Sequence, residues 1–323
     1  MSFSFRPLLF AACMALALPA QARDFRAAET QVSDYPTEEG IPNMRNLLNQ
    51  RSNGRLNIKV FANGTLGSER DTIEQLKIGG VDMIRLSVAP LNNIVPETIV
   101  LSLPFIFRSE DHMHTVLDGP IGDEILAAME KQGIVGLAWY DDGARSIYTK
   151  GRPVRTLADL KGMKIRVQQS DVFVSMVEAL GASPTPLPYG EVYTALTTGI
   201  IDAAENSLLS YETSRHFESA PYYNLTEHSL LPSLVVFSKP IWDRLPEKDR
   251  ALIRQAARDS VQHVRELQKE RQAKAREVVQ AGGAQMIPVE NKQAFADAVQ
   301  PMYAKFATTP ELKSLVERIQ ATK

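Results

Sequence analysis

The chain has 323 residues, a formal net charge of −2 and a pI of about 6.3. It has no excess of basic residues, which argues against nucleic acid as a partner. Hydrophobic residues make up 44% of the chain and charged residues 23%, the balance of a globular protein long enough for two cores.

The first 22 residues have the three parts of an export signal. Arg6 supplies a positive charge, Leu8–Leu18 forms an apolar run, and Ala20-Gln21-Ala22 has the small residues of a cleavage site. The run is too short for a membrane anchor, which needs about 20 residues. We therefore predict cleavage after Ala22 and a soluble periplasmic protein. The single cysteine, Cys13, lies inside the apolar run, so we expect neither a lipid anchor nor a thiol in the mature chain.

Strands and helices alternate in the first part of the mature chain. Apolar residues recur at every second position in the strands and at helical spacing in the helices. The expected order is a strand at Phe25–Glu29, a helix at Thr37–Ser52, a strand at Leu56–Phe61, a helix at Ser68–Ile78 and a strand at Val81–Ser87.

Two helices and two extended segments follow. We expect a short helix from Ser109, a longer one at Ile121–Gln132, a strand at Ile134–Tyr140, and an extended segment that carries Arg145.

The segment from Met163 to Asn206 combines a strand, a helix, a helix and a strand. In Met163–Val167 apolar residues alternate with polar ones, so Arg166 stands on a half-buried strand. Ser170 or Asp171 caps a helix that ends before Gly181, and a proline-rich connection leads to Tyr189. After a helix at Glu191–Thr198, a strand ends on Asn206. We expect Arg166 and Asn206 to lie side by side at one edge of a sheet.

The segments Ser68–Ser87 and Pro188–Ser207 follow one plan, displaced by 120 positions (87 to 207). In this comparison Glu69 falls opposite Tyr189, and Leu86-Ser87 falls opposite Asn206-Ser207. Strand-helix-strand units often resemble one another, so the identity alone does not demonstrate a repeat. Two similar lobes would place a ligand between them, beyond the carboxyl ends of their strands.

The last part of the chain is mainly helical. A strand at Leu234–Phe237 precedes a helix from about Pro246 to Ala281, whose apolar stripe is narrow. The stripe is too rich in alanine and too irregular for a coiled coil, and indicates a helix that lies along two lobes. A helical tail with Phe306 and Leu312 closes the chain.

Motifs for catalysis are scarce. Nucleotide-binding glycine loops and nucleophile elbows are absent, and His112 and His114 have no third ligand at metal spacing. We therefore predict no catalytic residues, no metal and no cofactor. Arg145, Arg166, Asn206 and Tyr189 are instead types that orient a ligand, because arginine binds a carboxylate through two parallel hydrogen bonds. A surface ion pair is the common alternative for any single arginine.

Several motifs together resemble the substrate-binding proteins of tripartite ATP-independent periplasmic (TRAP) transporters, of the DctP type, over the whole mature chain. The resemblance is carried by LKGMKIRV, PLPYGEVYTALTTGIIDAAEN, GARSIYTKGRPVRTLADLKG, LPFIFRS and VFSKPIWDRLP. It implies an α/β fold of two lobes with a ligand cleft between them, similar to type II periplasmic binding proteins. The lobes would comprise residues 23–143 with 232–271, and residues 144–231 with 272–323.

The resemblance also implies roles for individual residues. Arg166 would form the main salt bridge to the carboxylate of the substrate, with Arg145 and Asn206 as further contacts and the ring of Tyr189 packed on the ligand. Those residues belong to the second lobe. Glu29, Glu69 and Ser87 would line the first lobe, where carboxylates accept hydrogen bonds from hydroxyl groups.

The motifs LGSERDTIEQLKIGGVDMIR and AAENSLLSYE resemble the branch that binds uronic acids such as glucuronate and galacturonate. The expected function is uptake of a hexuronate, delivered by a monomeric receptor to the small and large TRAP membrane subunits. A dicarboxylate or keto acid is the alternative ligand. The alternative functions are a periplasmic enzyme that processes sugar acids, and a receptor of an ABC transporter.

Overall fold

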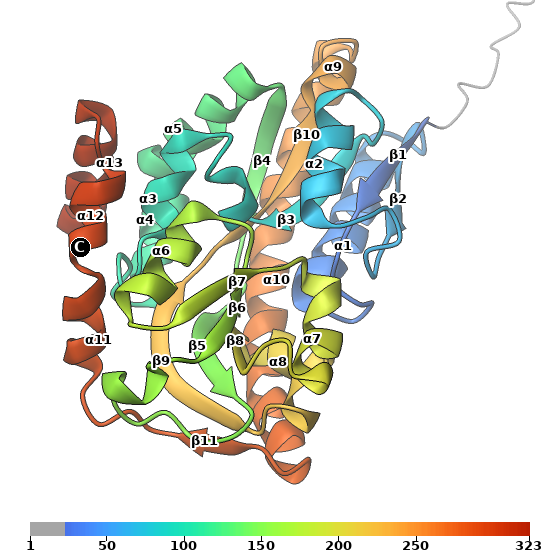
Figure 1. Cartoon of the computed structure of the whole chain (residues 1–323). Coiled ribbons are helices and arrows are strands. Elements are labelled where there is room, and N and C mark those ends of the chain that lie inside the picture. Colours follow the sequence, from blue (N-terminus) through green and yellow to red (C-terminus); the bar gives the residue numbers. More distant parts are fainter. Residues whose placement is uncertain (1–22) are drawn as a thin grey trace, which may run out of the picture.

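The computed structural model describes residues 23–323; the predicted export signal and Cys13 lie outside these residues. Two sheets form the centres of two lobes (Figure 1). The first sheet has the order β2-β1-β3-β10-β4 and the second has the order β11-β9-β5-β8-β6-β7. The predicted α/β fold with two lobes is confirmed.

The first sheet contains β1 (Arg23–Ala28), β2 (Leu56–Phe61), β3 (Met83–Ser87), β4 (Ile134–Tyr140) and β10 (Ser233–Ser238). The second contains β5 (Ala144–Thr149), β6 (Lys164–Val167), β7 (Ser183–Pro186), β8 (Ala203–Ser207), β9 (Tyr222–Leu230) and β11 (Gln285–Ile287). The helices are α1 (Pro36–Arg51), α2 (Glu69–Lys77), α3 (Ile99–Ser102), α4 (Glu110–Leu117), α5 (Pro120–Ala128), α6 (Asp171–Ala179), α7 (Val192–Thr198), α8 (Leu208–Thr213), α9 (Lys239–Trp242), α10 (Glu247–Ala281), α11 (Lys292–Val299), α12 (Pro301–Phe306) and α13 (Pro310–Ala321).

The repeat inferred from the sequence is confirmed by the topology. In the succession β2-β1-β3-β10 the first three strands are parallel and the fourth is antiparallel, and β7-β6-β8-β5 has the same directions. Strand β3 runs from residue 83 to 87 and β8 from residue 203 to 207, the displacement of 120 positions. Gly79 and Gly199, which follow the equivalent helices, both have φ of 78°.

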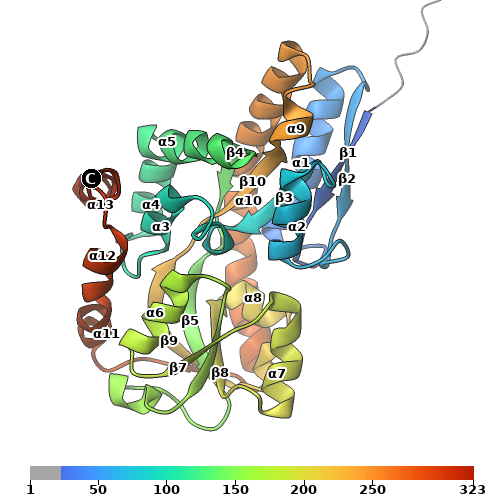
Figure 2. The same cartoon turned by 45° about the horizontal axis from the view of Figure 1, so that its top comes forward.

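Several segments connect the lobes. The chain passes from the first sheet to the second between β4 and β5, and returns between β9 and β10. Helix α10 packs against α1 and β4 of the first lobe and against α8 of the second, and Figure 2 shows it running behind both. The predicted helix along two lobes is confirmed. One apolar core extends through both lobes, with Leu86 and Val236 at one end and Ile147 and Val167 at the other.

The C-terminal helices divide between the lobes. Helices α11 and α12 pack against α6 of the second lobe, whereas α13 packs against α3 and α5 of the first. His112 Nε2 lies 2.9 Å from the carbonyl oxygen of Ile319, which fixes α13 to α4. We expected residues 272–323 to belong to the second lobe, so the position of α13 corrects that expectation for the last helix. Its apolar face is covered by first-lobe side chains such as Val100 and Ile125.

Three strands differ from the sequence-based expectations, and one of them is β11, which forms the other edge of the second sheet. The proline-rich connection contains β7, which pairs with β6 at the edge of the sheet, where the missing N–H groups of Pro184 and Pro186 do no harm. Strand β9 was not predicted, because its buried positions include the polar residues Asn224, Thr226 and His228. The buried positions of β9 therefore lack the alternation of apolar residues that predicts a strand.

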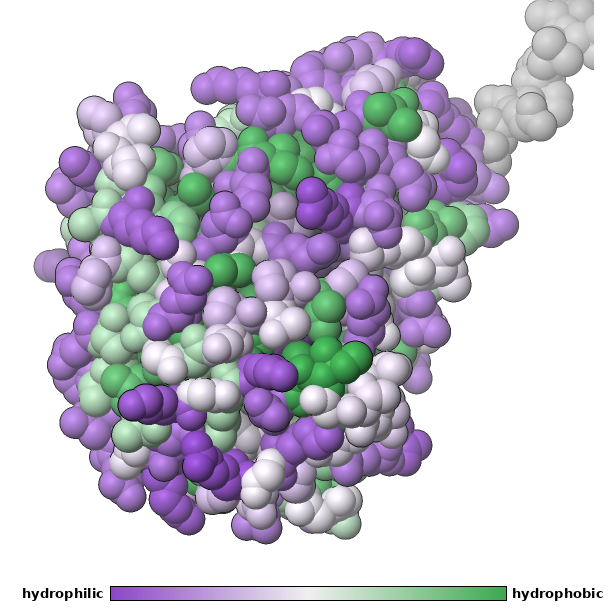
Figure 3. Space-filling model, viewed as in Figure 1, coloured by the Kyte–Doolittle hydropathy of each residue, from purple (hydrophilic) through white to green (hydrophobic). Residues whose placement is uncertain are grey.

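Polar and charged residues cover most of the face seen in Figure 3, and apolar residues gather there only in small patches. Among residues 23–323, no helix combines the length and the apolar composition needed to cross a bilayer.

Candidate functional site

A cavity of about 660 Å³ lies between the lobes, beyond the carboxyl ends of their strands. Both lobes contribute polar side chains to it, as a site for a hydroxyl-rich ligand requires. The first lobe contributes Thr30, Asn63, Ser68, Glu69, Arg70 and Asp71, and the second contributes Arg166, Gln168, Gln169, Tyr189, Glu191, Tyr193, Thr213, Ser214 and His216.

Glu69 is placed in the cavity by the start of α2. Ser68 caps this helix, since its hydroxyl accepts from the amide of Asp71 while the Asp71 carboxylate accepts from the amide of Ser68. One oxygen of Glu69 accepts a hydrogen bond of 2.7 Å from the amide of Ser87, at the end of β3. Burial raises the pKa of Glu69 above its usual range, and the Arg85 charge opposes that shift. Among residues 23–323 no hydrogen bond is made to its other oxygen, and Glu69 lines the cavity.

Arg166 lies on β6, between β7 and β8, and only 3% of its surface is exposed. Its Nε and Nη2 donate hydrogen bonds of 2.9 and 2.6 Å to the carbonyl oxygen of Leu187. Among residues 23–323 no carboxylate forms an ion pair with Arg166, and burial lowers its pKa. The Nη1 edge of the guanidinium is left for a partner from outside the chain, and a carboxylate is the partner that best offsets the buried charge.

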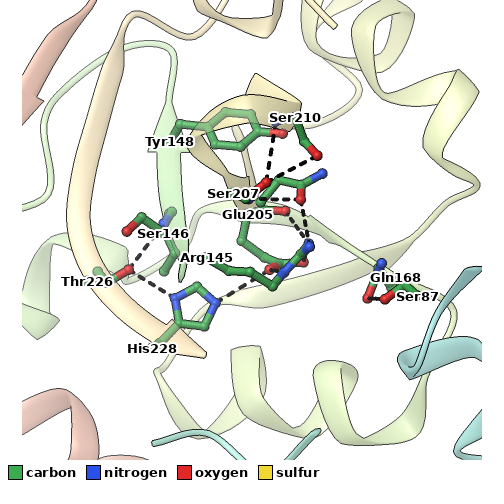
Figure 4. Close-up of polar contacts among 12 residues, drawn as sticks. Ser87, Arg145, Ser146, Tyr148, Gln168, Glu205, Ser207, Ser210, Thr226 and His228 are labelled. Carbon is green, nitrogen blue, oxygen red and sulfur yellow. Dashed lines mark hydrogen bonds and ion pairs between the residues drawn. The ribbon is translucent and has the colours of Figure 1, made fainter. Parts of the chain in front are cut away.

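Arg145 has a different environment, although it lies in the same lobe (Figure 4). Its guanidinium donates to both carboxylate oxygens of Glu205, at 2.6 and 2.9 Å, and to Oδ1 of Asn206 at 2.6 Å. Burial alone would raise the pKa of Glu205, but the charge and hydrogen bonds of Arg145, together with His228 Nε2 at 3.4 Å, lower it to about 2. Arg145 and Glu205 are therefore a buried ion pair, with the amide of Asn206 oriented by it.

Comparison with known proteins assigns this architecture to a family. Residues 27–309 match the family described as bacterial extracellular solute-binding protein, family 7, or DctP. The chain belongs to this family. It is a solute-binding protein of the TRAP type, and proteins of this family work outside the cytoplasmic membrane.

Three solved structures of TRAP periplasmic solute-binding proteins are similar to this DctP-family chain. The protein of Bradyrhizobium sp. BTAi1, in complex with galacturonate, is 61% identical, with a TM-score of 0.92 over 93% of this chain and 100% of that one. The protein of Xanthobacter autotrophicus Py2, with bound β-D-galacturonate, is 47% identical, with a TM-score of 0.91 over 93% and 100%. The protein of Pseudomonas putida F1, with bound D-glucuronate, is 41% identical, with a TM-score of 0.90 over 93% and 98%.

The structure brings three of the seven predicted ligand residues of this DctP-family protein to the cavity wall: Arg166, Tyr189 and Glu69. Arg145, Asn206, Glu29 and Ser87 are buried next to it and bonded to other protein groups. Glu29 pairs with Arg85, the residue that occupies the position on β3 equivalent to that of Glu205 on β8. The assignment of all seven as ligand contacts stays a prediction.

Gln168 and His216 are two of the lining residues that were not predicted. Gln168 directly follows the strand that carries Arg166, so the predicted strand already placed it two residues from a predicted ligand contact. Its side-chain oxygen lies 3.3 Å from the hydroxyl of Ser87 in the other lobe. His216 lies in a 3-10 turn after α8, where no periodicity marks it.

The two lobes also touch outside the cavity. The hydroxyl of Tyr35 in the first lobe donates to Asp142 at 2.6 Å and lies 3.0 Å from the hydroxyl of Ser210 in the second. Asn92 of the first lobe also donates to the Ser170 hydroxyl of the second, at 2.8 Å. The lobes are therefore closed on one another.

In the part of the chain from Arg23 to Lys323, no group of three or more histidine, aspartate or glutamate side chains is placed to hold a metal ion.

Proposed function

We propose that this protein binds a hexuronate, with galacturonate and glucuronate as the leading ligands, and delivers it to the TRAP membrane subunits for uptake. The observation that carries the proposal is Arg166, a buried guanidinium in a polar cavity whose only hydrogen-bond partner from residues 23–323 is a carbonyl oxygen. A ligand carboxylate supplies the missing negative charge.

The rest of the cavity suits the hydroxyl groups of a sugar acid. Glu69 and Gln168 offer oxygen atoms that accept hydrogen bonds, and the ring of Tyr189 offers an apolar face to the pyranose. Similar proteins crystallised with galacturonate or glucuronate support this ligand class. The predicted contacts from Arg145, Asn206, Glu29 and Ser87 require that ligand binding rearranges the hydrogen bonds that these side chains make.

A binding panel tests the ligand class. Calorimetry of residues 23–323 with galacturonate, glucuronate, succinate and pyruvate should show stoichiometric binding of a uronate only. The ligand recovered after binding should be chemically unchanged, because the proposed role is transport and not catalysis. Binding of succinate or pyruvate without a uronate would refute the hexuronate proposal, and turnover of the ligand would refute the receptor role.

The proposed location is the periplasm, reached by cleavage after Ala22. Protein purified from a periplasmic fraction should therefore begin at Arg23, and an N-terminus at Met1 or a lipid on Cys13 would contradict the proposal.

A further inference from the structure

His216 is buried at the wall of the cavity, with 1% of its surface exposed. It opens the 3-10 turn His216–Glu218, and the residue before it, Arg215, has φ of 57°. Such a left-handed backbone is unfavourable for a residue with a Cβ and persists only where the surrounding structure enforces it. The surrounding structure therefore holds the backbone of the turn that carries the buried His216 ring.

One ring nitrogen of His216 has a protein partner. Nδ1 lies 2.7 Å from the hydroxyl oxygen of Tyr148, a fully buried residue on β5. The charge of Arg166 acts on both the Tyr148 hydroxyl and the imidazole. A positive charge favours the orientation in which the phenol oxygen faces the guanidinium and the phenol hydrogen points to Nδ1. The imidazole then carries its own hydrogen on Nε2.

His216 is uncharged in this setting. Burial, and then the charge of Arg166, lower the pKa of His216 to about 3. A second cation beside the buried Arg166 would be repelled in the empty protein, whereas a neutral N–H group adds a donor without that cost. The ring of His216 also packs edge-on against Tyr189, at 6.1 Å between ring centroids. A donor, a guanidinium and an aromatic ring thus all line the cavity, with the ring against the imidazole and the guanidinium charge acting on it.

We propose that His216 binds the carboxylate end of the ligand through its Nε2–H, beside Arg166, and that Tyr148 is a positioning residue that fixes the required tautomer. The inference rests on the proposed uronate function. Arg166 supplies the positive charge that attracts the carboxylate, and the neutral Nε2–H group of His216 supplies a hydrogen bond that fixes the orientation of the carboxylate. The pair distinguishes a carboxylate on a sugar ring from the hydroxymethyl group of the corresponding hexose.

The test compares galacturonate affinity in matched variants of residues 23–323. His216→Phe keeps a flat ring and removes both nitrogens, and should weaken binding by about tenfold to a hundredfold, the effect of losing a hydrogen bond to a charged group. His216→Gln, which retains a donor, should recover part of the loss. Tyr148→Phe should weaken binding by a smaller factor.

Tyr140→Phe is the matched control, because the hydroxyl of Tyr140 is equally buried and bonds to Ser260, away from the cavity. It should lower the melting temperature of the empty protein without changing the affinity. If His216→Phe behaves like this control, His216 is only a structural partner of Tyr148 and the inference is wrong.

Nitrogen NMR of wild-type protein labelled in histidine provides a second readout that does not depend on any variant folding. We expect the His216 signals of an Nε2–H tautomer, with the Nε2 signal shifted by saturating galacturonate. An Nδ1–H tautomer, or signals that ignore the ligand, would overturn the inference while leaving the calorimetric demonstration of uronate binding intact. Wild-type protein that binds no uronate would instead refute the proposed function and this inference together.

Discussion

Arg166 is buried without a carboxylate partner from residues 23–323, and this determines how substitutions there should behave. Arg166→Lys keeps the positive charge but loses the planar group that binds a carboxylate through two bonds. We expect galacturonate affinity to fall by about 30-fold to several thousandfold, because breaking such a buried pair costs about 2–5 kcal/mol. Calorimetry on the variant measures the effect.

The melting temperature of the empty Arg166→Lys protein is the control. It should stay close to the wild-type value, because Arg166 has no carboxylate partner among residues 23–323 and the substitution removes only its hydrogen bonds to the Leu187 carbonyl. Near-wild-type affinity in a folded Arg166→Ala protein would show that Arg166 does not bind the ligand.

Glu38, in the first turn of α1, predicts a pH dependence of stability. Burial, and then the charge of Glu29, raise the pKa of Glu38 from 4.5 to about 7. Between these values the folded protein holds a proton that the unfolded chain has released, so the free energy of unfolding decreases as pH rises through this window. Glu38→Gln should therefore stabilise the protein by up to about 3 kcal/mol at pH 8, and by little at pH 4.

Denaturant titrations of both proteins at the two pH values measure this difference. An equal effect of Glu38→Gln at pH 4 and pH 8 would show that the side chain titrates normally.

The sequence could predict Arg166 because its strand neighbours are apolar, so that an arginine there had to be buried. The partners of the other arginines were not predictable in this way. Arg145 and Glu205 are 60 positions apart, and the antiparallel register of β5 against β8 decides that they meet. The same holds for Glu29 and Arg85, whose pairing depends on the parallel alignment of β1 and β3.

At the scale of elements, Gly199 ends α7 with φ of 78°, and a Cβ placed there would meet no atom within 4 Å. Gly199→Ala should therefore lower the free energy of unfolding by about 1 kcal/mol through backbone strain alone. Gly151 is the matched control, since a Cβ there also meets no atom and its backbone is not left-handed. Gly151→Ala should be neutral or slightly stabilising in the same denaturant titration. Equal effects of the two substitutions would contradict the strain argument.

The elements that were predicted well carry both a periodic apolar pattern and a clear end signal. Strand β2 has the predicted bounds, and α2 lies between its capping serine and Gly79. Strand β9 lacks such a pattern, because its inward-facing side chains bond to β5: the side-chain nitrogen of Asn224 donates to the carbonyl oxygen of Ile147, and Thr226 accepts from the amide of Ile147. Polar groups that are satisfied only in the folded protein give no periodic signal.

At the scale of the molecule, the hydroxyl of Tyr35 holds the lobes together without touching the cavity. Tyr35→Phe should favour an open arrangement and weaken galacturonate binding by about threefold to tenfold, since a buried hydrogen bond contributes about 1 kcal/mol. Small-angle scattering should show a larger radius of gyration for the empty variant than for the empty wild type, and compaction of both on ligand addition. An unchanged radius with ligand bound would count against closure of the lobes.

The position of β10 sets an order of events during synthesis. This strand lies between β3 and β4 in the first sheet, yet it consists of residues 233–238 and follows the main strands of the second sheet in the chain. A nascent chain that has emerged only to residue 230 leaves β3 and β4 unpaired with each other, so the N-terminal lobe cannot be completed first. The order of the strands therefore delays completion of the first lobe until residues 233–238 are available.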